Sequence, residues 1–181
     1  MAALSLSLCA TICFADGQQP QVLPTRDVEI TYKVTRPHQP TIIEHAHWLA
    51  SEHLERMDGP DKSSTIFDRD KKEITVLNDT SRTFHKLEGT PRQPMDPTKG
   101  EPLKRGGEDK IAGVRCVDWS WSQDAETHTA CLTADGVLLR LQVDGDTIMQ
   151  ALSVSYHRQD AKLFDVPKGY SPALVPTGAS E

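Results

Sequence analysis

Residues 127–156 read THTACLTADGVLLRLQVDGDTIMQALSVSY, and this stretch decides the fold. Two pairs of turn-forming residues interrupt it, Asp135-Gly136 and Gly145-Asp146. Both pairs favour the positive φ angles that two-residue hairpin turns require. Apolar residues recur between the turns, as in strands that bury one face. The stretch therefore predicts three antiparallel strands joined by two tight turns.

The two turns also predict which residues face each other, because a two-residue turn fixes the register of its hairpin. Apolar side chains meet at most of the positions paired in this way. The predicted facing pairs are Leu132 with Leu139, Ala130 with Leu141, Cys131 with Arg140, Val143 with Ile148 and Leu139 with Leu152.

A fourth strand precedes this stretch and carries a cysteine. Residues 114–121 and 127–133 both favour β structure, and the polar residues 122–125 connect them. Pairing Trp121 with Glu126 places Cys116 directly opposite Cys131, at a separation that suits a disulfide. We predict that bridge; the alternative is two reduced, buried thiols. A zinc site is disfavoured because two ligands do not complete a tetrahedron.

This meander is predicted to have one apolar face, with both cysteines on the other face. Such a face must be covered or must form the wall of a cavity. Eight of its residues form the candidate apolar pocket: Val117, Trp119, Leu132, Leu139, Leu141, Val143, Leu152 and Val154. Trp119 and Trp121 are interpreted as core anchors rather than a platform for stacking a ligand.

The first half of the chain is also predicted to be largely β. Residues 28–34 alternate apolar and polar, and shorter strands are expected at 64–67, 73–77 and 82–87. Residues 41–57 are ambiguous, because Ile42, Ala46, Leu49, His53 and Met57 share one helical face, which favours a helix over a strand. Four prolines and four glycines between 88 and 107 predict a long irregular loop.

The first fifteen residues are uncharged and largely apolar, and Cys13-Phe14-Ala15 resembles a signal-peptidase site. We interpret 1–15 as a secretory signal peptide, the alternative being a buried N-terminal helix. It is too short to span a bilayer as a helix, which takes about 20 residues. The expected organisation is then an extended lead-in at 16–26, one β domain at 27–172 and a flexible tail at 173–181.

The composition excludes some classes of function. A net charge of −6 gives no basic surface for nucleic acid or anionic membranes. The usual enzyme and phosphate-loop motifs are missing, so no catalytic residue and no cofactor are predicted. The nearby carboxylates Asp68 and Asp70 lie among basic residues and fit a solvated turn.

Three histidines, His45, His47 and His53, raise the question of a metal site. On a strand, His45 and His47 would project from the same face, while on a helix they would point apart. Because the sequence offers no third ligand at a matching spacing, we predict no metal site and interpret these histidines as structural.

Several segments together resemble uncharacterised exported bacterial proteins related to the lipoprotein carrier LolA. The clearest are DGVLLR at 135–140 and the closing FDVPKGY at 164–170. The resemblance is supported by the strand at 28–35, by Met57-Asp58, Phe67-Asp68 and Ala112-Gly113, and spans most of 27–172. It implies a mainly β, strongly curved antiparallel half-barrel with an apolar concave face, a loop or helical cover, and strand rather than helix within 41–57.

Two functions follow as hypotheses, because a shared fold is weak evidence for a shared activity. The first is an exported, non-enzymatic protein of the periplasm that binds a lipid or another apolar ligand in the hollow. The alternative is a structural or regulatory periplasmic protein that binds a partner protein through a sheet edge or the 88–107 loop. LolA's loop residues for lipoprotein handover cannot be placed in this chain.

Overall fold

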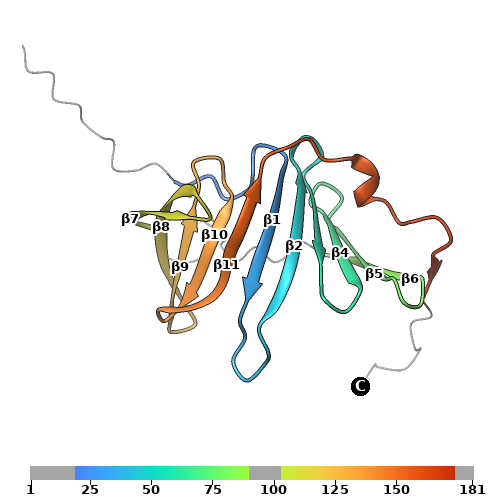
Figure 1. Cartoon of the computed structure of the whole chain (residues 1–181), viewed down its shortest axis with the longest axis horizontal. Coiled ribbons are helices and arrows are strands. Elements are labelled where there is room, and N and C mark those ends of the chain that lie inside the picture. Colours follow the sequence, from blue (N-terminus) through green and yellow to red (C-terminus); the bar gives the residue numbers. More distant parts are fainter. Residues whose placement is uncertain (1–18, 90–102, 174–181) are drawn as a thin grey trace, which may run out of the picture.

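The computed structural model describes residues 19–89 and 103–173. The predicted signal peptide, the centre of the Pro/Gly-rich loop and nearly all of the predicted tail lie outside these residues. Figure 1 shows one twelve-stranded sheet that curves strongly and does not close. The mainly β half-barrel predicted from the sequence is therefore confirmed.

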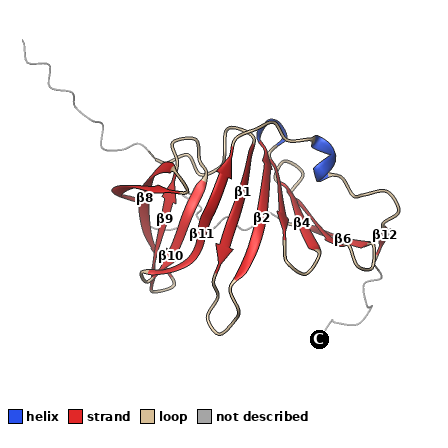
Figure 2. Cartoon of the chain, viewed as in Figure 1, coloured by secondary structure: helices blue, strands red, loops and turns tan. Residues whose placement is uncertain are grey.

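The strands follow one another as hairpins on either side of the sheet centre. Their spatial order is β12-β6-β5-β4-β3-β2-β1-β11-β10-β9-β8-β7, and among the described strands only the β12–β6 pair is parallel. The bounds are β1 Val28–Val34, β2 Ile42–Leu49, β3 Leu54–Asp58, β4 Ser63–Asp68, β5 Glu73–Asn78, β6 Thr83–Glu88, β7 Lys104–Ile111, β8 Val114–Gln123, β9 Glu126–Leu132, β10 Leu138–Val143, β11 Asp146–Ser155 and β12 Ser171–Pro172. The two short 3-10 helices are η1 Ala50–Glu52 and η2 Ala161–Phe164, shown in Figure 2.

The ambiguous segment 41–57 contains strands β2 and β3 rather than a helix. The single turn η1 connects them, and His53 ends it with a φ of 48°. Strand β2 pairs with β1 and places Ala46 and Trp48 in the core beside Ile30 and Val28. The helix favoured by the apolar spacing is therefore wrong, because long-range pairing on both sides of β2 outweighs local periodicity.

Two predicted connections need correction. Residues 104–107 belong to strand β7, so the irregular segment is shorter than 88–107. The turn before β9 consists of Asp124 and Ala125, both at positive φ, instead of the four residues 122–125. The β8–β9 register therefore moves by two residues, and Cys131 lies opposite Asp118.

The Cys116–Cys131 disulfide is nevertheless present, with Cα atoms 5.3 Å apart. The bridge is diagonal: Cys116 lies two residues from the position opposite Cys131, on the same face of the sheet. The disulfide was predicted correctly, but from a wrong register, because a diagonal neighbour is also within reach.

The other hairpins of the meander differ in detail from the prediction. Ala130 lies opposite Leu141 and Cys131 opposite Arg140, as expected. A bulge in β10 puts Leu138, not Leu139, opposite Leu132. The second turn is Asp144-Gly145, so Val143 pairs with Asp146 rather than Ile148. Strand β11 is also shifted by bulges in its pairing with β1 and in its pairing with β10. The prediction that Leu139 faces Leu152 is also wrong, because a bulge changes which side chains meet.

The outer face of β3–β6 is covered by the C-terminal segment, residues 157–173. Phe164 of η2 packs with Leu49, Ile66 and Leu77, and Val166 and Tyr170 adjoin this cluster. Arg56 donates a hydrogen bond to the Leu163 carbonyl at 2.8 Å. This cover lies outside the half-barrel and leaves its hollow to other residues.

Candidate binding site in the hollow of the half-barrel

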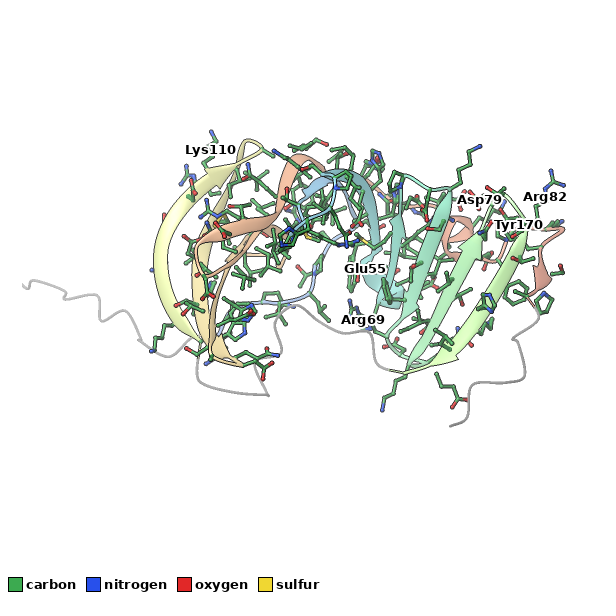
Figure 3. All side chains as sticks on the ribbon, turned by 90° about the horizontal axis from the view of Figure 1, so that it is seen from below. Glu55, Arg69, Asp79, Arg82, Lys110 and Tyr170 are labelled. Carbon is green, nitrogen blue, oxygen red and sulfur yellow. A yellow bond between two sulfur atoms is a disulfide. The ribbon has the colours of Figure 1, made fainter. Side chains whose placement is uncertain are left out.

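A cavity of about 240 Å³ lies against the inner face of the sheet. Its walls come from β1–β4 on one side and β9–β11 on the other. Seven neighbouring strands can line one cavity only because the sheet curves around it. Figure 3, which looks along the arc of strands, shows Glu55 and Arg69 on its inner side.

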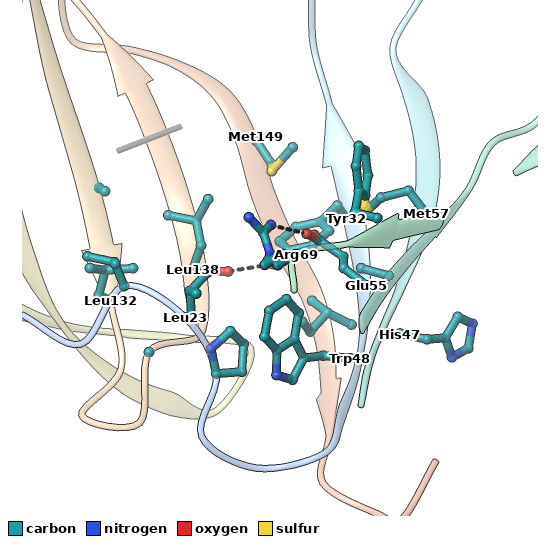
Figure 4. Close-up of a pocket in the computed structure, with 17 residues that line it drawn as sticks. Leu23, Tyr32, His47, Trp48, Glu55, Met57, Arg69, Leu132, Leu138 and Met149 are labelled. Carbon is teal, nitrogen blue, oxygen red and sulfur yellow. Dashed lines mark hydrogen bonds and ion pairs between the residues drawn. The ribbon is translucent and has the colours of Figure 1, made fainter. Parts of the chain in front are cut away.

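The cavity walls are mainly apolar, as expected for a ligand site. Alternate residues of β1 and β2 supply Ile30, Tyr32, Ala46 and Trp48, because a strand directs every second side chain to the same face. The other wall residues shown in Figure 4 include Met57, Phe67, Leu132, Leu138 and Met149.

Residues 22–24 cover part of the hollow. Val22 packs on the cluster that contains Trp119 and Trp121, and Leu23 packs on the core beside β1. A Cβ atom at Gly136 would lie 2.2 Å from the Leu23 carbonyl oxygen, so only glycine allows this approach. The described part of the expected lead-in, residues 19–26, thus has no regular secondary structure but forms part of the cover of the apolar face.

An ion pair lies in this apolar wall. Arg69 donates from Nη2 to Oε2 of Glu55 at 2.5 Å, and its guanidinium lies 5.3 Å from the centre of the Trp48 ring. The Arg69 side chain is 13% exposed and that of Glu55 is 26% exposed. Nε and Nη1 of Arg69 and Nε1 of Trp48 are buried with no hydrogen-bond acceptor. Buried donors of this kind are uncommon, because desolvation without a partner costs free energy.

Tyr32 connects the two walls. Its hydroxyl donates to the Leu138 carbonyl at 2.7 Å, which joins β1 to the start of β10 across the hollow. Complete burial raises the pKa of this phenol far above its ordinary value. Tyr32 is therefore a neutral structural donor.

The predicted pocket residues are distributed over several places. Leu132 lines the cavity. Val117, Trp119 and Leu141 belong to the adjacent apolar cluster of β8–β10, which also contains Ala130. Leu139 is fully buried in the other cluster, with the disulfide, and Val154 adjoins that cluster. Val143 is partly buried, and Leu152 is 50% exposed at the β11 bulge.

The opposite wall of the cavity, from β1 to β4, was not predicted from the sequence. Trp48 and Met57 fell in the segment whose helical and strand interpretations competed. Arg69 lay in a charged stretch interpreted as a solvated turn. Glu55 next to the apolar residue Leu54 was the available signal, but the proximity of Glu55 to Arg69 depends on the pairing of β3 with β4.

Two of the three histidines, His45 and His47, lie on β2, His53 directly follows η1, and each has separate partners. His45 contacts the Thr31 hydroxyl, and His53 contacts the Asp70 carboxylate at 3.0 Å. The ring of His47 points away from the cavity (Figure 4) and contacts Gln159 and Asp58 on the outer face. The hydrogen bond and charge of Asp58 raise the pKa of His47 against the opposing effect of burial.

Within residues 19–89 and 103–173, no three His, Cys, Asp or Glu side chains are grouped as a metal site would require. In the same residues, no helix has the length and apolar character needed to cross a bilayer. The absence of a physiological metal remains a prediction, which purification without an affinity tag and metal analysis can test.

No family model matches the sequence, and no curated protein matches it either. Solved structures do match the fold. The crystal structure of MucB has a TM-score of 0.58 at 13% identity, with 82% of this chain and 60% of MucB covered. For the MucA/MucB complex of Pseudomonas aeruginosa the TM-score is 0.57 at 14% identity, covering 77% and 55%.

PNGF-II gives a TM-score of 0.54 at 16% identity, and the match covers 82% of this chain and 31% of that protein. The chain thus spans between about a third and three fifths of the proteins that it matches. At these identities the similarity shows a common fold and does not transfer a function.

Proposed function

We propose that this protein is an exported, non-enzymatic binding protein whose hollow holds an extended apolar segment of a partner protein. The observation that carries the proposal is the course of residues 22–24. They cross the hollow as irregular chain and leave a cavity of about 240 Å³ beside them. The hollow therefore already accommodates polypeptide, in a space with further apolar wall.

The comparison with MucB supports a protein partner. MucB shares the fold of this chain, and its structure has been solved in complex with MucA. An apolar concave surface with few polar groups is also what a partner segment needs, because burial of apolar area supplies most of the free energy of association.

The disulfide supports export. Cysteine pairs persist in oxidising compartments and are rare in the cytosol. The Cys116–Cys131 bridge and the apolar residues 1–15 agree with secretion through a signal peptide into a periplasm. A structural role for the bridge fits its burial, since both cysteines are at most 2% exposed.

The polar groups in the described cavity wall support a binding role rather than a catalytic one. Its hydroxyl, on Tyr32, donates to a carbonyl, and its carboxylate, on Glu55, is paired with Arg69. No nucleophile lies beside a general base in this wall. This arrangement supports binding without chemistry.

A second candidate is an apolar small molecule, such as a lipid, in the same cavity. The mainly apolar walls favour it, because alkyl chains bind by burial alone. The sheet edge at β7 is a weaker candidate for a partner site. Its charged residues, Gly106-Gly107 and a bulge are features that discourage pairing with another strand.

A photo-crosslinking experiment tests the proposal. Benzoyl-phenylalanine replaces Phe67, which lines the cavity, or Lys33, which is exposed on the outer face of β1. Both variants are expressed with their natural export and irradiated in intact cells. We expect a defined polypeptide adduct from position 67 and none from position 33. A lipid adduct from position 67 supports the second candidate, and equal adducts from both positions contradict binding in the hollow.

A further inference from the structure

We propose that the Glu55–Arg69 pair makes the hollow selective for a peptide amide over an alkyl chain. This inference rests on the proposed function and specifies the chemistry of the occupant. Glu55 and Arg69 are the charged side chains in the described cavity wall, apart from His47, whose ring points outward (Figure 4). The pair is thus the main polar feature that an occupant meets.

The hydrogen-bonding capacity of this pair is only partly used. One guanidinium nitrogen of Arg69 donates to Glu55, while Nε and Nη1 have no acceptor. The indole Nε1 of Trp48, whose ring faces the guanidinium, also lacks an acceptor. The Glu55 carboxylate is 26% exposed, and each carboxylate oxygen can accept more than one hydrogen bond. Donors and an acceptor therefore lie together in one apolar wall.

An alkyl chain cannot satisfy these groups. Sealing the cavity with hydrocarbon removes water from the ion pair and supplies neither donor nor acceptor in return. A peptide unit carries one N–H donor and one C=O acceptor. It matches the carboxylate of Glu55 and the guanidinium of Arg69 at the same time. Sites built to form hydrogen bonds discriminate strongly against ligands that lack the matching group.

The charge balance of the pair favours an uncharged group. Because Glu55 already compensates Arg69, a ligand carboxylate would add an uncompensated negative charge in an apolar wall. A fatty acid or a peptide C-terminus is therefore less suited than an internal amide. In the bound state we expect the guanidinium to rotate off the Trp48 ring and donate to the ligand carbonyl.

The chain itself shows that a peptide backbone reaches the hollow. The Leu23 carbonyl lies so close to Gly136 that no Cβ atom fits between them. Leu23 and Arg69 both line this cavity (Figure 4). A second extended segment beside residues 22–24 would place its amides against the ion pair.

The test uses the exported full chain and defined probes. The peptide probe is fluorescent Lys-Val-Leu-Val-Val-Leu-Lys, and its ester analogues replace one internal amide at a time, which removes the N–H donor. A fluorescent dodecanoic acid is the alkyl probe. The variant pair is Glu55→Met with Arg69→Met, which leaves neither donor nor acceptor, and the matched control is Glu73→Met with Lys86→Met, which removes a largely exposed ion pair of β5 and β6.

We expect one ester replacement to weaken binding to the wild type by about tenfold, the size of a typical net hydrogen bond. In the Glu55/Arg69 variant the amide and ester peptides should bind equally, and the fatty acid should bind more tightly than to the wild type. The Glu73/Lys86 control should behave as the wild type. A charge-reversed variant, Glu55→Arg with Arg69→Glu, retains a donor and an acceptor in the wall and should still prefer the amide to the ester; loss of this preference in a folded variant would contradict the inference.

Two negative results are distinguishable. If the wild type binds the peptide but every ester binds as well as the amide, the selectivity is refuted and the proposed function stands. If the wild type binds the fatty acid but not the peptide, or binds neither probe, the proposed function fails and this inference fails with it.

Discussion

The two halves of the sheet are held in different ways. Strands β7–β11 form a meander of consecutive hairpins, braced by the Cys116–Cys131 disulfide. Strands β2–β6 also follow one another, but the segment 157–173, which is distant in the sequence, covers their outer face. The stability of the meander therefore depends mainly on local pairing and a covalent bridge, whereas the β2–β6 half depends on long-range packing.

Loss of the cover of the β2–β6 half should lower the stability of the protein most. Phe164 is 8% exposed and packs on Leu49, Ile66 and Leu77. We expect Phe164→Ala to destabilise the protein by about 3–5 kcal/mol, because the apolar contacts are lost and a cavity remains. Denaturant unfolding measures the free energy, and hydrogen exchange locates the loss. Faster exchange in β4–β6 than in β8–β10 is expected, and a uniform change would contradict the division into halves.

Removal of the disulfide is the corresponding test of what stabilises the meander. The bridge closes a span of 15 residues, and this loop corresponds to about 3 kcal/mol in the chain-entropy model, less what the hairpin already contributes. Cys116→Ser with Cys131→Ser should therefore lower stability by less than Phe164→Ala and should raise exchange in β7–β9. Thiol titration of the unreduced, unfolded exported protein should find no free thiol, and two reactive thiols per chain would refute the assignment.

Two outer-face arginines allow a sharper comparison. Arg140 joins β10 to Asp109 of β7 at 2.7 Å and to Asp118 of β8 at 3.1 Å. Arg56 joins β3 to Ser64 and to the Leu163 carbonyl of η2. Replacing either by Met should cost about 1–3 kcal/mol, since each change leaves polar partners unsatisfied.

The two replacements should differ in where exchange increases. Arg140→Met should release the β7 edge, and Arg56→Met should release residues 157–173. The same hydrogen-exchange pattern in both variants would show that the halves do not behave independently.

The smallest expected effect is a pH dependence confined to the C-terminal segment. A hydrogen bond to Glu29 raises the pKa of His157, and a hydrogen bond to Asp58 raises the pKa of His47. Arg56 also donates to the Asp58 carboxylate. A raised pKa in the folded state means that these contacts stabilise fully below the unfolded pKa of about 6.5. Their contribution is lost as the pH rises through the folded values.

We therefore expect the backbone amides of residues 157–170 to exchange more slowly at pH 6 than at pH 8, after correction for the pH dependence of the intrinsic exchange rate. Exchange in the meander should change less. The variant His47→Gln with His157→Gln provides the control, because it should remove the difference. A pH dependence that persists in this variant would exclude the two histidines as its origin.

The meander was predictable because its signals are local. Turn dipeptides and apolar alternation identified β9, β10 and β11, and two cysteines outside an expected signal peptide identified the disulfide. The exact registers were not predictable. Positive φ at Ala125 and the bulges of β10 and β11 move side chains by one or two positions, as at Leu139 and Leu152. A bulge depends on tertiary contacts and leaves little trace in a sequence.

The β2–β6 half and the binding site show the opposite case. The helical spacing of 41–57 is a real local pattern, yet pairing of β2 with both β1 and β3 decides its structure. Arg69 and Glu55 meet because β3 pairs with β4, and Leu23 reaches the hollow because Gly136 admits its backbone.

By itself, the sequence determined the β class, the curved antiparallel architecture through a family resemblance, the meander and its disulfide. These features depend on turn geometry, side-chain alternation and covalent chemistry, which act over a few residues. Only the tertiary structure decided which apolar residues form the cavity and placed an ion pair in its wall. Curvature of the sheet brings seven strands around one space, and contacts between residues distant in sequence are set by the packing of the whole chain.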